Sequence, residues 1–367
     1  SRLHGADGPQ SVIDLKHINP VTLDYIESGI KAGTNHNPDF NGISQEGIGV
    51  YQVTQVNGAR CSTAKGFLSD KVKQRHNLTI MTECDVDAIL LKDKVAVGVN
   101  YSQKDKHQQV FASKEVLLCA GAIGSPQILL QSGIGPAKDL HAVGLEVNHE
   151  LDGVGKNLQD HLDGTVLFKQ KSSRSYGISV SGLIKNSLAP YQYWRSKDGM
   201  LSSNIAEGGA FIKSSPDKKL PDVQIHFLPA LLLDHGRTKP FGHGFTFHFC
   251  NLYPKSRGTV SMVKRLGKLD VSIAPNYLSH EDDIQAMVAG FKWANKVASC
   301  GPLSEGASPF IPNTELHSDD KIIEFIRSNA ETVYHPVGTC KMGSQDDPTS
   351  VVCAQLKVHG IARLRVV

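Results

Sequence analysis

The chain has 367 residues, of which 40% are hydrophobic and 20% charged, and its net charge is +3 with histidine neutral. This composition excludes a disordered or collagen-like chain and allows two or three globular domains with a sizeable core. A charge of +3 spread over the whole chain gives no basic stripe, so we do not expect a nucleic-acid partner.

The seven cysteines are widely spaced; the nearest two, Cys340 and Cys353, are thirteen positions apart. This spacing excludes the usual zinc and thioredoxin-like motifs and favours reduced thiols, so we expect no metal centre. No run approaches the about 18 apolar residues that a membrane span needs, and the first residues carry no signal-peptide pattern. We therefore expect a cytoplasmic protein without a transmembrane segment.

The first element expected in chain order is a helix over residues 20–32, where apolar side chains recur at helical spacing and Gly33 follows. A polar stretch rich in turn residues comes next. Three short apolar runs then predict a β-meander, and they cover residues 78–82, 88–91 and 95–99.

A strand followed by a helix is expected after the meander. The run 115–121 is almost entirely apolar, which predicts a strand buried on both faces, as in a parallel sheet. Ser125 and Pro126 predict the N-cap and first residue of a helix over residues 127–132. A strand, a glycine turn and a helix N-terminus together form a corner that can bind a cofactor.

The segment from about residue 164 to residue 329 has a different pattern. Its apolar and polar residues alternate, which predicts an antiparallel sheet with one covered face and strands at residues 223–227, 245–249, 259–263 and 269–273. Two amphipathic helices follow, with Ser279 and Ser318 as their N-caps. Strands followed by helices predict an α+β domain.

Common nucleotide-binding loops are missing from the sequence. Every Gly-x-Gly in the chain lacks the third glycine of Gly-x-Gly-x-x-Gly, and no P-loop occurs. An NAD-dependent Rossmann enzyme is therefore not favoured, and nicotinamide binding would be needed to revive that hypothesis.

Four strings resemble the glucose–methanol–choline (GMC) family of flavin oxidoreductases and follow in its order. Residues 121–135 fill every constrained position of the family's second signature, and the other strings are residues 39–42, 153–161 and 335–343. The resemblance covers nearly the whole chain and is greatest to the bacterial branch of choline dehydrogenases and medium-chain alcohol dehydrogenases. It implies FAD as the cofactor, part of an FAD/NAD(P)-binding Rossmann-like domain of α/β class, and an α+β substrate domain built on an antiparallel sheet.

The resemblance also implies how the chain divides. Residues 1–76 would be a loop-rich segment with one helix that bridges the flavin and substrate regions, residues 77–163 and 335–367 part of the FAD-binding domain, and residues 164–334 the substrate domain. Family members begin with a Gly-x-Gly-x-x-Gly loop and end after a strand with a second active-site His or Asn, and neither lies here. The chain also stops within an expected strand. We therefore expect it to be truncated at both ends.

By the resemblance, His335 is the catalytic base. Oxidation of an alcohol by a flavin removes a hydride from the carbinol carbon, so a base must take the hydroxyl proton, and an imidazole with an ordinary pKa near 6.5 suits that role. Pro336 restricts the residue before it to extended backbone, which helps to aim the ring. The alternative is an ordinary histidine, one of 16 in the chain.

Three residues are predicted to contact FAD. The glycine turn lets the backbone approach the cofactor, with Ala120 and Gly121 near its adenosine side, and Val86 occupies the position whose backbone holds the adenine in the family. The alternatives are ordinary helix capping for the glycine turn and a core position for Val86.

Glu207 occupies the place where choline-oxidising relatives keep a carboxylate that can face a quaternary ammonium, and we expect it to bind substrate. Those relatives have an aromatic residue just before it, whereas this chain has Ala206. The loss of a cation–π contact, about 0.5–2 kcal/mol, favours an uncharged primary alcohol over choline. The alternative is a surface glutamate before a Gly-Gly turn.

Two further segments allow more than one interpretation. Asp160 and His161 resemble a catalytic dyad, but adjacent residues rarely converge on one substrate atom, so we interpret them as structural. The apolar run 228–233 and the polar residues 234–240 after it are either a core strand that leads into a solvated turn or a loop that gates substrate or touches a membrane.

The sequence therefore predicts an FAD-dependent oxidoreductase that oxidises the CH–OH group of a primary alcohol to an aldehyde. Its electron acceptor would be a quinone or another acceptor, and peripheral contact with the inner membrane is one option for its location. The alternatives are choline dehydrogenase proper and a truncated, non-catalytic remnant that binds no FAD. Flavin absorbance of the purified chain separates the remnant from the enzyme.

Overall fold

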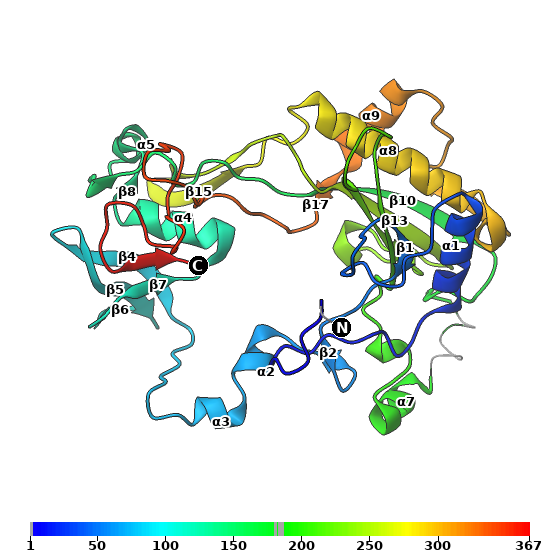
Figure 1. Cartoon of the computed structure of the whole chain (residues 1–367), viewed down its shortest axis with the longest axis horizontal. Helices are drawn as coiled ribbons and strands as arrows, with labels where there is room; N and C mark the ends of the chain where they lie inside the picture. Colours follow the sequence, from blue (N-terminus) through cyan, green and yellow to red (C-terminus); the bar gives the residue numbers. More distant parts are fainter. Residues whose placement is uncertain (1–2, 180–181, 183–186) are drawn as a thin grey trace. The chain divides into compact units, whose positions relative to one another are not determined.

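A computed structural model describes residues 3–179, 182 and 187–367 (Figure 1). The chain forms two compact units, each assembled from three separate segments. Unit 1 comprises Ser1–Thr79, Leu162–Tyr253 and Asp282–Glu331, and unit 2 comprises Ile80–His161, Pro254–Glu281 and Thr332–Val367.

Unit 1 is built on a mostly antiparallel sheet. Its strands are β1 (Gly47–Val50), β10 (Leu162–Gln170), β11 (Gly208–Ile212), β12 (Val223–Leu228), β13 (Gly244–Asn251) and β16 (Ala307–Ile311), in the order β1-β11-β12-β13-β10-β16, with β17 (Glu331–Thr332) paired to β10. Neighbours in this order run antiparallel. The sheet predicted from the alternation at residues 223–227 and 245–249 is confirmed.

One face of this sheet is an aromatic core covered by helices. The helix α1 (Pro20–Lys31) begins after the N-cap Asn19 and confirms the predicted helix, and α8 (Glu281–Ala298) lies between β13 and β16 in sequence. Tyr25 of α1 stacks on Phe227 with ring centroids 4.2 Å apart, and Phe249 packs edge-on against Phe291 of α8. Figure 1 shows both helices along the sheet. Such pairs add about 0.5–1.5 kcal/mol each beyond the area they bury.

The remaining described elements of unit 1 are short, apart from α9. They are β2 (Gln55–Val56), β3 (Ala59–Arg60), α2 (Thr63–Phe67), α3 (Asp70–Lys73), α7 (Ala189–Ser196), α9 (Asp319–Asn329) and the 3-10 helices η1 (Met200–Ser202), η2 (Asp234–Gly236) and η3 (Gly301–Ser304). Ser318 caps α9 as predicted, because its hydroxyl accepts from the N–H of Lys321. Leu228, Ala230 and Leu231 are buried ahead of η2, which agrees with the core alternative for this run.

Unit 2 contains the predicted meander in a shifted position. Its strands are β4 (Asp85–Lys92), β5 (Val95–Gln103) and β6 (Lys106–Phe111), joined antiparallel. The predicted strand at residues 78–82 is wrong, because this apolar run has no strand partner and is mostly exposed. The third strand is the polar β6, which pairs with β5. Lys104 and Asp105, both with positive φ, form the turn between the two strands. This is the geometry of a two-residue type I′ hairpin.

A parallel strand pair and a helix form the predicted corner. β7 (Val116–Leu118) runs parallel to β18 (Leu364–Val366), and α4 (Gly121–Gln131) follows. The structure corrects the sequence prediction twice. Leu117 is 55% exposed, so β7 is not buried on both faces. The helix begins at Gly121, before Ser125, so Pro126 lies inside it.

Unit 2 has further elements. They are β8 (Ile134–Gly135) parallel to β9 (His149–Glu150), α5 (Ala137–Ala142), and the hairpin of β14 (Thr259–Arg265) and β15 (Lys268–Ala274). Of these, β8 and β14 pack against α4. Buried Met262 of β14 shares one apolar cluster with Leu129 and Leu130 of α4. The hairpin therefore belongs to unit 2, although its strands were predicted within the segment 164–334.

The first segment also differs from the expected division. Instead of forming a separate bridging region, residues 1–79 are part of unit 1. β1 extends the sheet beside β11, and α1 covers its apolar face.

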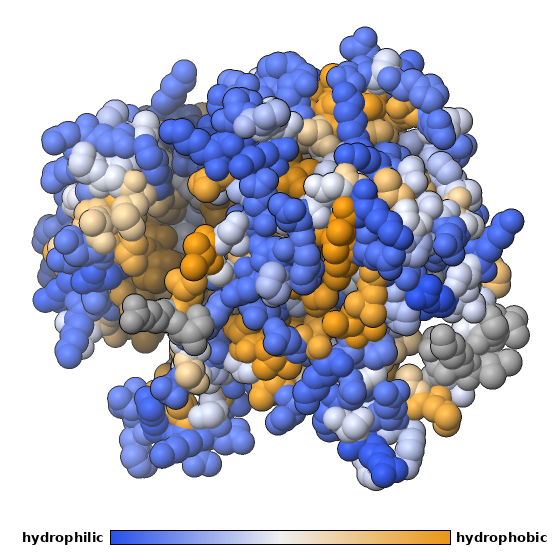
Figure 2. Space-filling view, turned by 45° about the vertical axis from the view of Figure 1, so that its right-hand side comes forward, coloured by the Kyte–Doolittle hydropathy of each residue, from blue (hydrophilic) through white to orange (hydrophobic). Residues whose placement is uncertain are grey.

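Among the described helices, none combines the length and the apolar character that crossing a membrane requires. The face in Figure 2 is mainly hydrophilic with separate hydrophobic patches.

Candidate active site

Two of the motif strings, residues 153–161 and 335–343, lie side by side in unit 2. The backbone N–H groups of Gln159 and Val337 each donate to the carbonyl of the other residue, at 2.9 and 2.8 Å. Gly338 follows with a φ of +94°, and a Cβ there would lie 2.5 Å from a backbone carbonyl oxygen of the facing string. Glycine therefore allows this close approach.

Asp160 fixes the backbone at His335. Its side chain is buried, and Oδ1 accepts from the backbone N–H groups of His161 and His335, each at 2.9 Å. Oδ2 accepts from the hydroxyls of Tyr277 and Thr332. Burial and the hydrogen bond to Asp160 raise the pKa of Tyr277, which keeps its hydroxyl a donor. Four donors fill the acceptor sites of one carboxylate.

The residue before His335 has a strained backbone. Tyr334 has a φ of +61°, in the left-handed region that costs a non-glycine residue about 1–3 kcal/mol. Its N–H donates to the hydroxyl of Thr332 at 2.9 Å, and that hydroxyl donates to Asp160. The hydrogen bonds to Asp160 therefore hold Tyr334 in a conformation that an isolated chain would disfavour. They thereby fix the backbone position of His335.

The rings of His161 and His335 are in contact. Their Nδ1 atoms are 3.1 Å apart, and the ring centroids are 5.2 Å apart at an interplanar angle of 76°. His335 is exposed and His161 is half-buried. The position of Asp160 agrees with the interpretation of Asp160 and His161 as structural. The ring contact of His161 was not predicted, although both histidines lie in strings that resemble the family.

Two of the residues predicted to bind FAD line one cavity of unit 2. It has a volume of about 410 Å³, and its largely apolar lining includes Val86, Leu117, Ala120 and Ile128. Val86 is 38% exposed, so it is not the core residue of the alternative interpretation. Gly121 follows Ala120 at the start of α4 with a φ of +73° and open space where a Cβ would stand.

The lining of this cavity suits part of FAD in its chemistry. An apolar wall suits a flat aromatic ring system, and the N-terminus of α4, which has no side-chain cap, presents free N–H groups suited to a phosphate. Val86 and Ala120 would border the ring system, and Gly121 would allow the backbone to come close.

Glu207 is a fully buried residue of unit 1. Oε2 accepts from the N–H of Asn19 at 2.7 Å and the hydroxyl of Thr22 at 2.8 Å, and Oε1 accepts from the hydroxyls of Tyr176 and Ser203 at 2.8 and 2.6 Å. Burial and then the Glu207 charge raise the pKa of Tyr176. The carboxylate thus ties the start of α1 to the strand β11.

The alternative interpretation of Glu207, a surface glutamate before a Gly-Gly turn, is wrong. The residue is not on the surface, and Gly208 and Gly209 after it start β11 rather than a turn. Four donors already occupy its two oxygens. A contact with substrate would require some of these donors to leave, so substrate binding by Glu207 stays a prediction without support from the geometry.

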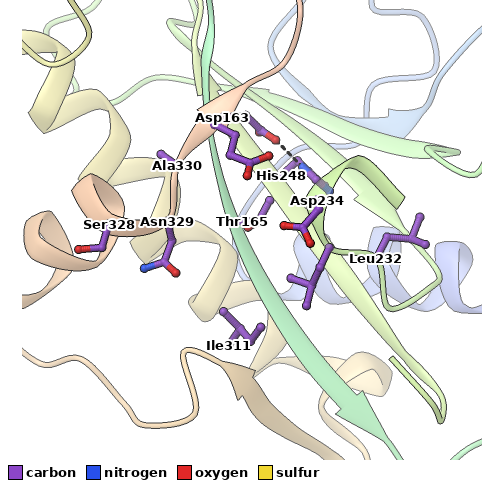
Figure 3. Close-up of a pocket in the computed structure, with 11 residues that line it drawn as sticks. Asp163, Thr165, Leu232, Asp234, His248, Ile311, Ser328, Asn329 and Ala330 are labelled. Atoms are coloured by element: carbon purple, nitrogen blue, oxygen red, sulfur yellow. Dashed lines mark hydrogen bonds and ion pairs between the residues drawn. The ribbon is translucent and has the colours of Figure 1, made fainter. Parts of the chain in front are cut away.

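Unit 1 contains a polar cavity of its own, which the sequence did not predict. It has a volume of about 310 Å³ and is lined by Asp163, Thr165, Leu232, Leu233, Asp234, His248, Ile311, Ser328, Asn329, Ala330 and Glu331 (Figure 3). Thr165 and His248 face each other across β10 and β13. Both strands were predicted, but their pairing was not, so the sequence did not bring these side chains together.

A buried ion pair forms one wall of this cavity. Asp163 is 2% exposed, and its Oδ2 lies 2.5 Å from Nδ1 of His248. Burial alone would lower the pKa of His248, but the Asp163 charge and hydrogen bond raise it above its ordinary value. Oδ1 of Asp163 has no hydrogen-bond partner among the described residues.

Comparison with known proteins identifies the family. Two family models described as GMC oxidoreductase match residues 10–163 and 254–367. An alcohol dehydrogenase (acceptor) of Pseudomonas putida is 44% identical over 370 residues, which cover 100% of this chain and 66% of that protein. The chain belongs to the GMC oxidoreductase family. The GMC resemblance inferred from the four strings is thereby confirmed.

Other GMC-type proteins extend the comparison. Oxygen-dependent choline dehydrogenase 1 of Chromohalobacter salexigens is 40% identical over 367 residues, covering 99% of this chain and 65% of that protein. The crystal structure of pyridoxine 4-oxidase from Mesorbium loti superposes with a TM-score of 0.84 at 26% identity, covering 99% of this chain and 67% of that one. The chain thus spans about two thirds of the length of these relatives. The predicted fold class is confirmed.

Proposed function

We propose that this chain is part of an FAD-dependent oxidoreductase that oxidises the CH–OH group of a primary alcohol to an aldehyde. The observation that carries the proposal is the exposed His335, whose backbone is bonded to buried Asp160. Unit 2 also contains the cavity that fits part of FAD. Family membership and the alcohol dehydrogenase relative support the same reaction class.

The roles of the chain's own residues follow from this proposal. His335 takes the hydroxyl proton of the alcohol, Asp160 holds the His335 backbone in place, and Val86, Ala120 and Gly121 hold the cofactor. When bound, FAD supplies the acceptor for the hydride that leaves the carbinol carbon. The alcohol thereby loses one proton and one hydride and becomes the aldehyde.

We propose an uncharged primary alcohol as substrate, with a quinone or another molecule as the final electron acceptor.

Choline is the second candidate substrate. A choline dehydrogenase is among the relatives. Against it stand Ala206, which provides no aromatic ring, and Glu207, whose oxygens are already bonded. Uncharged primary alcohols should therefore be oxidised with a higher kcat/KM than choline.

The test uses the natural full-length gene product and His335→Ala, assayed with primary alcohols, choline and an artificial electron acceptor. Loss of the general base should lower kcat by about 100- to 10,000-fold. A control substitution at exposed His76 (His76→Ala) should leave kcat unchanged. Turnover of His335→Ala close to that of the wild type would overturn the proposal.

Flavin content addresses the alternative that this chain alone is a non-catalytic remnant. The purified chain is mixed with FAD and separated from free cofactor, and its visible absorbance is recorded. Retained flavin that Gly121→Val abolishes would support the cofactor residues proposed here. A chain that stays colourless, beside a full-length protein that binds FAD, would support the remnant.

A further inference from the structure

The contact between His161 and His335 restricts the position of one proton. Two nitrogens 3.1 Å apart form a hydrogen bond only when one carries a proton and the other presents a lone pair. If both Nδ1 atoms were protonated, two N–H groups would face each other. If neither were, two lone pairs would. The pair therefore has two arrangements, and they differ in which ring donates.

The two arrangements leave different atoms free on His335. In the first, Nδ1–H of His335 donates to His161, so the neutral ring of His335 has its lone pair at Nε2. In the second, His161 donates, so neutral His335 carries its proton at Nε2. Only the first arrangement gives His335 a free nitrogen that can accept a proton without breaking the contact.

We propose that His161 is a positioning residue that accepts the Nδ1–H of His335 and so makes Nε2 of His335 the proton-accepting atom. This inference rests on the proposed role of His335 as base. In the step, the O–H bond of the alcohol breaks, an Nε2–H bond forms, and the pair changes from neutral to a single positive charge. The Nδ1 contact persists throughout.

The same contact stabilises the product of the proton transfer. Once Nε2 is protonated, His335 is a cation whose Nδ1–H still points at the lone pair of His161, and such charge-assisted hydrogen bonds are about twice as strong as neutral ones. His161 thus does with a neutral ring what a carboxylate does for a histidine in hydrolytic triads.

Asp160 and Tyr277 do not compete for this proton. Asp160 already accepts from four donors, and Tyr277 donates its hydroxyl to Asp160. The Asp160 carboxylate bonds the backbone N–H groups of both histidines rather than their rings. Asp160 therefore fixes the backbone positions of His161 and His335, and the contact between the two rings sets the tautomer of His335.

The test is the tautomer of His335, measured by nitrogen-15 NMR of the histidine side chains in the purified chain. At about pH 8 ordinary imidazoles are neutral, and the one-bond and two-bond couplings tell which ring nitrogen carries hydrogen. His335→Gln assigns the signals. We expect a protonated Nδ1 and an unprotonated Nε2 on His335. A proton on Nε2 would overturn the inference.

Two variants of His161 provide a matched pair. His161→Leu removes the acceptor and should shift His335 towards the Nε2–H tautomer. His161→Asp offers only acceptor oxygens and should keep the Nδ1–H tautomer. An unchanged tautomer in His161→Leu would overturn the inference. If that variant does not fold, a His161→Asp protein with Nε2–H on His335 would overturn it as well.

Kinetics in the full-length gene product separate this inference from the proposed function. His161→Leu should lower kcat by about 10- to 100-fold, and His161→Asp should recover most of it. If the tautomers behave as expected but His335→Ala still turns over, the proposed function fails and the tautomer assignment stands. If His335→Ala is inactive but the tautomer of His335 is the opposite one, only the present inference fails.

Discussion

The hydroxyl of Thr339 donates a 2.6 Å hydrogen bond to the carbonyl of Ala122. In an α-helix that carbonyl would accept from the N–H four residues later, but position 126 is a proline and has no N–H. Thr339 is 2% exposed and lies in the string that contains His335. The helix α4 therefore continues through Pro126 because a residue distant in sequence satisfies the carbonyl that the proline leaves free.

Replacing this hydroxyl should destabilise unit 2. In Thr339→Val the partly buried Ala122 carbonyl loses its donor, so the free energy of unfolding should fall by about 1–3 kcal/mol. Thr339→Ser keeps the hydroxyl and should lose less. Urea unfolding followed by far-UV circular dichroism measures both, and equal stabilities of the Val and Ser variants would contradict this account.

The carboxylate of Asp160 should be essential to the geometry around His335. In Asp160→Asn one oxygen still accepts from the two backbone N–H groups, and the hydroxyls of Tyr277 and Thr332 can turn to accept from the new amide. The free energy of unfolding should fall by about 1–2 kcal/mol, because neutral hydrogen bonds replace bonds to a charged group. The control is Asp152→Asn, an exposed aspartate of the same string, which should change stability by less than about 0.5 kcal/mol.

Local sequence signals account for most of the elements. The helix that starts after Asn19 has an apolar stripe and a cap, and the strands β12 and β13 alternate clearly, so each was predictable from its own residues. The polar strand β6 was not, because its place is set by pairing with β5. The start of α4 was also missed, because Thr339 compensates for Pro126 from more than 200 positions away.

The candidate site divides in the same way. His335 stays a prediction from a string that is specific to a family, and Val86 and Ala120, predicted from the same resemblance, line the cavity in unit 2. The His161 ring contact and the Asp163–His248 pair depend on which segments lie side by side. No single-residue pattern encodes such pairings, and adjacency in the sequence even argued against a role for His161.

Glu207 should matter for stability more than for substrate choice. In Glu207→Gln the hydroxyls of Tyr176 and Ser203 can turn to accept from the new amide, so the loss should be about 1–2 kcal/mol. In Glu207→Leu all four donors lose their acceptor, and the loss should be larger. Thermal unfolding of the two variants measures the difference.

The kinetic counterpart tests the predicted substrate contact of Glu207. If the carboxylate serves only to tie α1 to β11, Glu207→Gln in the full-length gene product keeps the KM for primary alcohols and the ratio of kcat/KM between alcohol and choline. A change of more than about tenfold in that ratio, at unchanged stability, would instead support substrate binding by Glu207.

The buried pair of His248 and Asp163 should make the stability of unit 1 depend on pH. Because the folded state raises the pKa of His248 above its unfolded value, the folded protein binds more protons between the two values. The stabilisation is therefore fully present below about pH 6.5, the ordinary histidine value, and is lost as the pH rises through the folded pKa. The free energy of urea unfolding should thus decrease with rising pH in that window. His248→Gln should flatten the decrease, whereas the control at exposed His76 (His76→Gln) should preserve it. A decrease of equal size in His248→Gln and the wild type would show that other groups cause it.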